Sequence, residues 1–226
     1  MGWILIKMAD LTLQPSTKDT VFSATAPDTN YGTLDYLQIG HWSTSVIIRA
    51  ILNFDASAIP AGSTINSATM SLDYWEYNYG NPSGQTAWAY KITRNDWVEL
   101  EATWNSYKTG FAWTTAGGDY VTSNPAGGSV AYPASYGWVG FDITAIVQDA
   151  VNNVSGSVNV LIKFADETIT QDAVHRSKEY ATASLRPKLV ISYTLAPATR
   201  SVSEVLALVD TTNKKAGFRR SLKERG

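Results

Sequence analysis

The chain has 226 residues, of which 44% are hydrophobic, and this excludes global disorder while allowing one sizeable core rather than two full domains. It contains no cysteine and two histidines, which excludes disulfides, thiolate metal sites and a cysteine nucleophile and leaves little material for a histidine metal cluster or triad. The formal net charge is only −2, but residues 196–226 carry seven basic and three acidic side chains, so a basic tail (+4) follows an acidic remainder (−6).

Residues 1–9 are predicted to be an extension of a domain that spans residues 10–195. The apolar run at residues 3–6 is far shorter than the ~20 residues that cross a bilayer. It is also shorter than the roughly 7–15 apolar residues of a signal peptide. Met8 is an alternative start to Met1. We therefore expect no membrane insertion and no signal-directed export, a combination that suits a protein assembled in a host cytoplasm.

Two strands with period-two alternation are predicted in the first half of the domain. In residues 46–54 the even positions should point inward and Arg49 and Asn53 outward, although Ile47 and Ile51 make this strand apolar on both faces. In residues 68–77 the predicted inward side chains are Ala68, Met70, Leu72 and Tyr74. The opposite, solvent-facing set is Thr69, Ser71, Asp73, Trp75 and Tyr77.

Three further strands follow the same reasoning. In residues 86–93 the bulky side chains Trp88, Tyr90 and Ile92 are predicted to face the core, with Ala87, Ala89 and Lys91 outside. Residues 158–164 should bury their even positions and expose Asn159 and Lys163. The closing strand should turn Leu189, Ile191, Tyr193 and Leu195 inward. Turn signals separate these strands, and the pattern predicts two packed antiparallel sheets.

One short helix is predicted inside the domain and another in the tail. Apolar residues at 143, 146, 147, 150 and 151 repeat at helical spacing, with Asp142 or Thr144 as the cap and residues 152–153 as the end. The tail carries a second apolar stripe and a basic continuation that we expect to bind a partner. Its binding residues are predicted to be Val202, Val205, Leu206, Val209, Lys214, Lys215, Arg219 and Arg220.

A series of segments forms an ordered pattern over residues 19–195. It includes Asp19-Thr20, Asn30-Tyr31-Gly32, the strands at 37–40, 49–55 and 65–72, the stretch 96–105 around Trp97 and Trp104, residues 138–144, Ser177-Lys178-Glu179 and residues 186–193. Together these segments resemble the DNRLRE family of β-sandwich modules, which is akin to jelly-roll carbohydrate-binding modules and occurs on microbial surfaces and in phage structural proteins. The resemblance implies an all-β, antiparallel jelly-roll sandwich with one short internal helix and a C-terminal helical, basic tail.

The resemblance also implies display or binding at a surface rather than catalysis. The tryptophans of residues 96–105 would then belong to the core, with Thr103 and Asn105 in turn bonding. Two regions depart from the family pattern, namely the long aromatic insertion at 105–137 and the chain beyond residue 193. Structureless loops of that length tend to be functional. We therefore interpret the insertion as a contact loop toward a glycan or another subunit.

A candidate glycan site lies on the outward face of residues 68–77. Trp75, Tyr77 and Tyr79 supply rings on which the apolar face of a pyranose could pack, and Asp73 and Arg49 are outward polar partners. The alternatives are that these aromatics are covered by the insertion or by a neighbouring subunit, or are simply exposed.

The chain offers no convincing catalytic group. Asp96, Glu99 and Glu101 could form the carboxylate pair of a glycosidase, but in the resembled family this stretch is a structural signature. His41 and His175 are expected to be solvated loop histidines. We expect no cofactor, although jelly-roll modules of the carbohydrate-binding kind often carry a structural calcium, for which Asp19, Asp28, Asp35 and Asp142 are oxygen donors of suitable hardness.

The favoured hypothesis is a non-catalytic surface protein of a virion, a capsid decoration or fibre component, with a glycan-binding or adhesion role. Its tail would bind a capsid protein, another virion protein or a neighbouring copy within an oligomer or larger assembly. Nucleic acid is not expected as a partner because the body is acidic. The alternative is an extracellular carbohydrate-binding module of an exported polysaccharide-processing system, and the weaker alternative is a glycoside-cleaving enzyme.

Overall fold

The computed structural model describes residues 7–42, 46–123 and 127–196. The predicted tail helix and its basic residues fall in 197–226, outside the described residues. The elements in chain order are β1 (Met8–Leu13), β2 (Lys18–Ser23), β3 (Tyr36–His41), β4 (Ile47–Asp55), β5 (Thr64–Glu76), β6 (Thr86–Lys91), β7 (Ser106–Lys108), β8 (Phe111–Ala112), β9 (Ser129–Ala131), β10 (Gly137–Asp142), α1 (Thr144–Asn153), β11 (Ser157–Phe164), β12 (Gln171–Arg176), η1 (Ala183–Leu185) and β13 (Lys188–Thr194).

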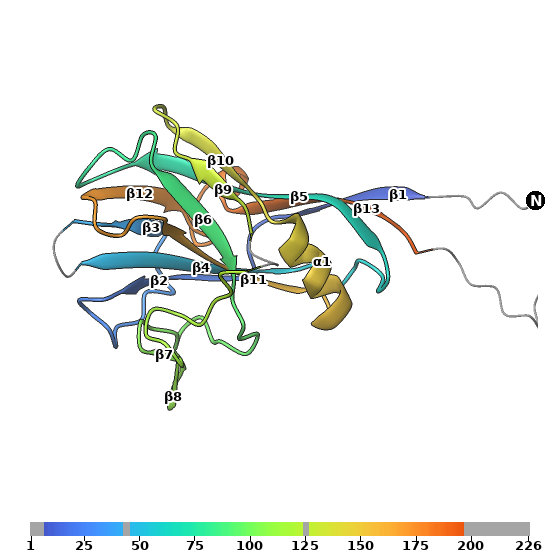
Figure 1. Ribbon diagram of the computed structural model, residues 1–226, viewed down its shortest axis with the longest axis horizontal. Helices are drawn as coiled ribbons and strands as arrows, with labels where there is room; N and C mark the ends of the chain where they lie inside the picture. The colour runs from blue at the N-terminus through green and yellow to red at the C-terminus, as the bar shows by residue number, and fades with distance from the viewer. Residues whose placement is uncertain (1–6, 43–45, 124–126, 197–226) are drawn as a thin grey trace, which may run out of the picture. The chain divides into compact units, whose positions relative to one another are not determined.

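Eleven strands form one continuous antiparallel sheet that curls into a β-sandwich (Figure 1), and β7 and β8 form a separate two-stranded sheet. The order along the sheet is β1-β13-β5-β12-β3-β4-β11-β6-β9, with β10 added beside β5 and β2 beside β4. One half is built around β5, which pairs with β10, β12 and β13, and the other around β4, which pairs with β2 and β11. β3 connects the halves because it pairs with both β12 and β4. The predicted all-β sandwich with one short internal helix is confirmed.

The main hydrophobic core lies between the two halves and confirms most of the predicted faces. Even-numbered side chains of β4 and β11 fill it from one half, and even-numbered side chains of β5 from the other. The closing strand contributes Leu189 and Ile191, with Tyr193 packed at the margin. Removing these side chains from water supplies the main stabilisation, on the order of 25 cal/mol for each Å² of apolar surface buried.

A second hydrophobic core covers the opposite face of the β2–β4–β11 half. Its buried members are Phe22, Ile51, Ile92, Trp97, Ala102, Tyr107, Trp113 and Leu161. Trp97 is oriented by a hydrogen bond from its Nε1 to Oδ1 of Asn159 at 2.7 Å. This core explains why Ile51 and Leu161 are apolar although they point away from the main core.

The second core corrects three predictions. Ala87 and Ala89 of β6 face the main core, whereas Trp88 and Tyr90 lie on the opposite face, so the predicted orientation of β6 is wrong. Asn159 and Lys163 were expected to be exposed but are buried. They lie on the sheet face that is covered by the chain between β6 and β9, which carries Trp97, Tyr107 and Trp113 and which we call the covering segment. Within the predicted contact loop at 105–137, Tyr107 and Trp113 pack on the domain's own sheet and Tyr132 enters the main core. Both faces of these strands are covered, so alternation could not identify the core side.

The internal helix α1 is confirmed and packs on the sandwich through Ile146, Val147, Ala150 and Val151. The N-cap residue is Ile143 rather than the predicted Asp142 or Thr144. The Asp142 carboxylate nevertheless accepts hydrogen bonds from the backbone N–H and the hydroxyl of Thr144, at 2.9 and 2.6 Å. This contact satisfies an N–H at the helix start that has no partner within the helix. No helix in the described part of the chain is long and apolar enough to span a membrane.

Both histidines were predicted to be solvated in loops, and this is wrong. His41 ends β3 and is buried, and His175 lies in β12 with no exposed surface. The hydroxyl of Tyr132 lies 2.7 Å from Nε2 of His175, in the main core. Desolvation by burial lowers the pKa of His175 to about 3, so this imidazole is neutral at neutral pH.

We predict that His175 makes the domain sensitive to acid. The unfolded state takes up a proton near pH ~6.5 and the folded state only near the lowered pKa, so stability falls as pH drops between these values, by up to about 1.4 kcal/mol per pH unit. The raised pKa of Asp19, about 7, gives a slope of opposite sign over the same range, so the His175 contribution is measured as the difference between the unaltered chain and His175→Gln in urea denaturation from about pH 7 to about pH 5. His175→Gln should lower stability at neutral pH and should lack the acid-dependent loss that His175 adds. An unchanged slope in this variant would assign the acid sensitivity to other groups.

Candidate functional site

A groove crosses the outer face of β3, β12 and β5, which we call the outer groove. Tyr36 of β3 stands opposite Arg176 of β12, and Gln38 stands opposite Val174, so their side chains share one face. Glu76 at the end of β5 is also opposite Val174. The groove encloses about 480 Å³, and its lining residues are Asp35, Tyr36, Gln38, Trp75, Glu76, Asn78, Tyr79, Val174 and Arg176.

Arg176 is held in place from three sides. Its guanidinium carbon lies 4.2 Å from the centre of the Trp75 ring and 3.9 Å from that of Tyr180. Its Nε lies 3.5 Å from Oδ2 of Asp73. The positive charge is therefore balanced by a carboxylate and two π faces, and the arginine serves as a rigid wall of the groove.

The segment after β5 forms the rim of the groove and is anchored by Asp172. This carboxylate is fully buried and accepts hydrogen bonds from the backbone N–H groups of Asn78, Tyr79 and Gly80, at 3.0, 2.6 and 3.3 Å to Oδ1. Its Oδ2 accepts a further bond from Nε2 of Gln38 at 2.9 Å. One buried charge thus fixes both the rim and a polar side chain of the groove floor.

Tyr79 presents an aromatic surface at this rim. Its ring stacks on Trp42 with centroids 4.2 Å apart and an interplanar angle of 9°. A second depression of about 310 Å³ lies beyond it and shares Tyr36, Gln38 and Tyr79 with the groove. Burial, aided by Tyr31 and Asp35, raises the pKa of Tyr36, so its hydroxyl stays protonated at neutral pH.

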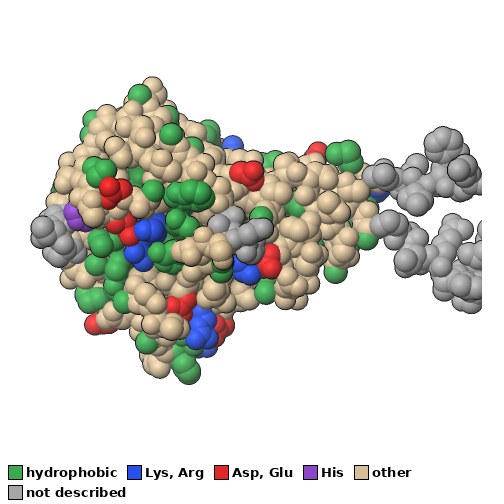
Figure 2. All heavy atoms as spheres, in the orientation of Figure 1, with side chains coloured by type: hydrophobic (Ala, Val, Ile, Leu, Met, Phe, Trp, Pro, Cys, Tyr) green, Lys and Arg blue, Asp and Glu red, His purple; other side chains and the backbone are tan. Residues whose placement is uncertain are grey.

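The outer groove has an acidic character. Asp35 and Glu76 line it, and neither has an ion-pair partner among the described residues. In the view of Figure 2, by contrast, acidic and basic side chains lie beside one another rather than in patches of one sign. Examples elsewhere on the domain are Lys108 with Asp96 and Lys163 with Glu167.

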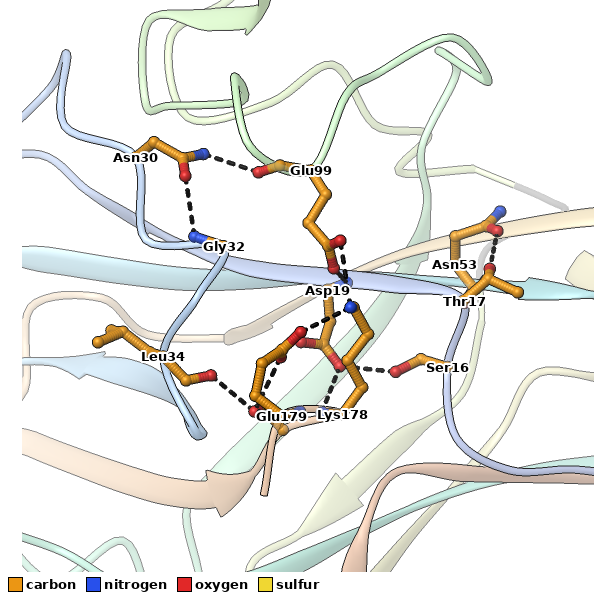
Figure 3. Close-up of polar contacts among 11 residues, drawn as sticks. Ser16, Thr17, Asp19, Asn30, Gly32, Leu34, Asn53, Glu99, Lys178 and Glu179 are labelled. Atoms are coloured by element: carbon orange, nitrogen blue, oxygen red, sulfur yellow. Dashed lines mark hydrogen bonds and ion pairs between the residues drawn. The ribbon is translucent and has the colours of Figure 1, made fainter. Parts of the chain in front are cut away.

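A second polar site lies among three carboxylates, which we call the carboxylate cage (Figure 3). Asp19 comes from β2, Glu99 from the turn after β6, and Glu179 from the segment after β12, and one oxygen of each lies within 4.8 Å of the others. The ammonium of Lys178 lies 3.2 Å from Oε2 of Glu99 and 2.6 Å from Oε1 of Glu179.

Asp19 is the buried member of the cage. Its Oδ2 accepts hydrogen bonds from Ser16 Oγ at 2.6 Å and from the backbone N–H of Lys178 at 3.0 Å. Its Oδ1 is buried without a hydrogen-bond partner. Desolvation, together with the charges of Glu179 and Glu99, raises the pKa of Asp19 to about 7. The cage thus holds three carboxyl groups but only one ammonium, that of Lys178, so its acidic groups outnumber its basic ones.

The disaggregatase-related repeat domain matches residues 19–191, from β2 to β13, and so includes both the groove and the cage. The chain belongs to this family. Its resemblance to DNRLRE modules is thereby supported at the level of a carbohydrate-binding-like domain, although the matching family is the disaggregatase-related one. No curated protein matches the chain.

The outer groove unites part of the predicted glycan site. Trp75 and Tyr79 line it, Asp73 pairs with its arginine, and Tyr77 is exposed just beyond β5. Trp75 is not an open platform, however, because Arg176 lies on its ring.

Arg49 does not belong to this site. It lies in β4 under the covering segment, where it pairs with Glu167 at 2.8 Å and stacks on Trp104. The groove residues absent from the predicted glycan site are Asp35, Tyr36, Gln38, Glu76, Asn78, Val174 and Arg176. The alternation of residues 36–40 could have identified Tyr36 and Gln38 as lying on one face of their strand. The pairing of β3 with β12, which brings Arg176 beside them, could not be predicted from the sequence.

The other predicted polar residues separate into distinct roles. Of the four carboxylates named as oxygen donors of suitable hardness for calcium, Asp19 lies in the cage and Asp35 in the groove, while Asp28 accepts a bond from Asn105 and Asp142 accepts two from Thr144 at the start of α1. The three carboxylates of the glycosidase alternative each have a structural partner. Glu99 accepts the N–H of Asp19 at 2.7 Å, Glu101 that of Thr109 at 2.8 Å, and Asp96 pairs with Lys108 at 2.7 Å.

We predict that Asp172→Asn destabilises the domain by roughly 2–4 kcal/mol, because an amide turns donor hydrogens toward buried N–H groups and lacks the charge that binds them. Urea denaturation measures the loss. Asp10→Asn, at an exposed position of β1, is the matched control and should change stability by less than about 0.5 kcal/mol. Equal stability of the two variants would show that the rim does not depend on this carboxylate.

Proposed function

We propose that this domain is a non-catalytic surface module that binds a glycan in the outer groove. The observation that carries the proposal is the groove itself, where aromatic rings and hydrogen-bonding side chains from three strands and a rigid rim converge on one cavity. Ligand sites combine such apolar surface with a few fixed polar groups. Membership in a carbohydrate-binding-like family supports the same conclusion.

The groove offers the two kinds of contact that a sugar ring requires. Tyr79 exposes 53% of its surface while its other face is held by Trp42, so its ring is available for stacking without reorganisation. Asn78, Gln38 and the protonated hydroxyl of Tyr36 supply donors and acceptors for sugar hydroxyls.

The charge of the groove favours one class of glycan. Asp35 and Glu76 would repel a uronate and attract an amino group, and Arg176 is already engaged by Asp73. We therefore expect neutral or amino sugars to bind in preference to acidic polysaccharides.

The non-catalytic part of the proposal rests on how the candidate carboxylates are used. Glu99 and Glu101 accept hydrogen bonds from backbone N–H groups, and Asp96 pairs with a lysine. The groove carboxylates Asp35 and Glu76 line the cavity together with Tyr36, Gln38 and Asn78, whose side chains suit binding. These contacts support structural and binding roles.

The location of the module on a virion surface is proposed from the resemblance to phage structural proteins, with attachment through the predicted basic tail to a capsid protein or a neighbouring copy. The alternative is an extracellular module of a polysaccharide-processing system. Detection of the protein in purified particles from the producing culture, and its loss from particles when residues 200–226 are deleted, would support the first. Recovery only from particle-free medium would support the second.

We predict that Tyr79→Ala abolishes glycan retention with little loss of stability. The test is affinity electrophoresis or calorimetry against a panel of neutral, amino-bearing and uronate-bearing polysaccharides. Phe111→Ala is the matched control, because Phe111 is equally exposed (53%) but lies on the β7–β8 hairpin. Removing a stacking ring should weaken binding at least about tenfold.

Two outcomes would contradict the proposal. Equal binding by Tyr79→Ala and the control would place the site elsewhere. Release of new reducing ends from any polysaccharide of the panel would show that the protein is an enzyme.

A further inference from the structure

The strand β1 forms one end of the sheet and has an open edge (Figure 1). In the described part of the chain it pairs with β13 alone, whereas the opposite end of the sheet is β9, which has only three residues. β1 has six residues, and its pairing with β13 is regular. An edge strand of this length without lysine, proline or a bulge lacks the usual features that prevent further pairing.

The register of β1 shows which backbone groups face the open edge. The N–H of Leu195 donates to the carbonyl of Lys7 at 3.0 Å, so these two residues bond across the strands. Alternate residues of an antiparallel strand bond to the same neighbour, so the odd-numbered residues of β1 face β13. The residues that present their N–H and C=O groups to the open edge are Met8, Asp10 and Thr12. Among the residues that the structure describes, these groups have no main-chain partner.

The side chains of β1 leave the margin of the main core partly uncovered. Leu11 and Leu13 point inward and pack against the core, but both are only partly buried. Tyr193 of β13 packs at the same margin and is also partly buried. A further strand beside β1 would bring apolar side chains against this margin and remove it from water, in addition to satisfying the open backbone groups.

We propose that β1 pairs with β1 of a second copy of this chain, antiparallel and about a two-fold axis, so that the two sheets become continuous. The open edge is complementary to itself, because both copies present the same alternation of donors and acceptors. Addition of a strand to an exposed edge draws its affinity from these main-chain hydrogen bonds and its specificity from the side chains that meet.

The charge of Asp10 selects the register of this pairing. An axis at Asp10 would set two carboxylates directly opposite each other, which destabilises a strand pair. With the axis at Leu11, this residue faces Leu11 of the second copy, and Asp10 exchanges both backbone hydrogen bonds with Thr12. The small Ala9 then lies opposite the larger Leu13. This axis also keeps residues 9–13 in the pairing, whereas an axis at Ala9 would keep only residues 8–10 of β1.

Pairing of this kind places the outer grooves of both copies on the same side of the joined sheet. Directly opposite residues of paired strands share one face, so the two-fold axis is perpendicular to the sheet. In each copy the groove lies on the outer face of β3, β12 and β5. The dimer would therefore present two grooves to one polysaccharide or one surface and gain avidity, and this consequence rests on the proposed function of the groove.

The first test is analytical ultracentrifugation of the full chain over a concentration series. The unaltered chain should associate reversibly into a dimer, since a strand of six residues is a short interface. Thr12→Pro should weaken this dimer at least about tenfold, because proline removes an N–H that faces the open edge but none that bonds to β13. Its circular dichroism spectrum should match that of the unaltered chain.

The register has a separate test, because the chain contains no cysteine. Leu11→Cys places two thiols opposite each other across the axis, where the ~4.5 Å between Cα atoms of such a pair allows a disulfide. With oxidised glutathione this variant should form a covalent dimer on a non-reducing gel. Leu13→Cys is the matched control on the same face of β1, and it should remain uncross-linked because it faces Ala9 of the second copy.

A chain that stays monomeric throughout the concentration series would overturn the proposal. A folded Thr12→Pro that dimerises as the unaltered chain does, or a dimer that is lost when residues 200–226 are deleted, would place the interface elsewhere. Cross-linking of Leu11→Cys that does not exceed that of Leu13→Cys would overturn the pairing, and this comparison decides alone if Thr12→Pro does not fold. A dimer that binds no glycan would contradict only the proposed function.

Discussion

The structure depends on one constraint, namely that β4 and β11 carry apolar side chains on both faces and both faces must be kept from water. The main core covers one face, and the segment around Trp97, Tyr107 and Trp113 covers the other. The hydrogen bond from Trp97 to Asn159 orients this cover on the sheet. Because this half of the sandwich is closed by its own chain, the outer groove lies on the other half, where β3, β12 and β5 meet.

The sequence was sufficient to predict the antiparallel sandwich, the internal helix and the inward faces of β4, β5 and β11. It was not sufficient to predict which face of β6 points toward the main core. In β6 alanines alternate with large aromatic residues, and because both faces are covered, this alternation does not identify the main core. The same cover explains Arg49, which alternation correctly placed away from the main core but which is buried beside Glu167 rather than available to a ligand.

The sequence predicted where the candidate site lies, but it did not predict most of the residues that line it. Trp75 and Tyr79 follow from the outward face of a single strand, so local alternation found them. Tyr36 and Arg176 reach the same surface through the pairing of β3 with β12, two segments more than a hundred residues apart. The Arg176 guanidinium then changes the role of Trp75 from an open ring to a support. The cage could not be predicted for the same reason, since its carboxylates come from three distant segments.

The central claim is that the outer groove binds a glycan, and the most direct measurement is amide chemical-shift mapping of the full chain during titration with a neutral or amino-bearing oligosaccharide. The account predicts that perturbations cluster at residues 35–38, 76–79 and 174–176. Perturbations confined to the segment 105–120 over the second core, or none with any oligosaccharide of the panel, would contradict it.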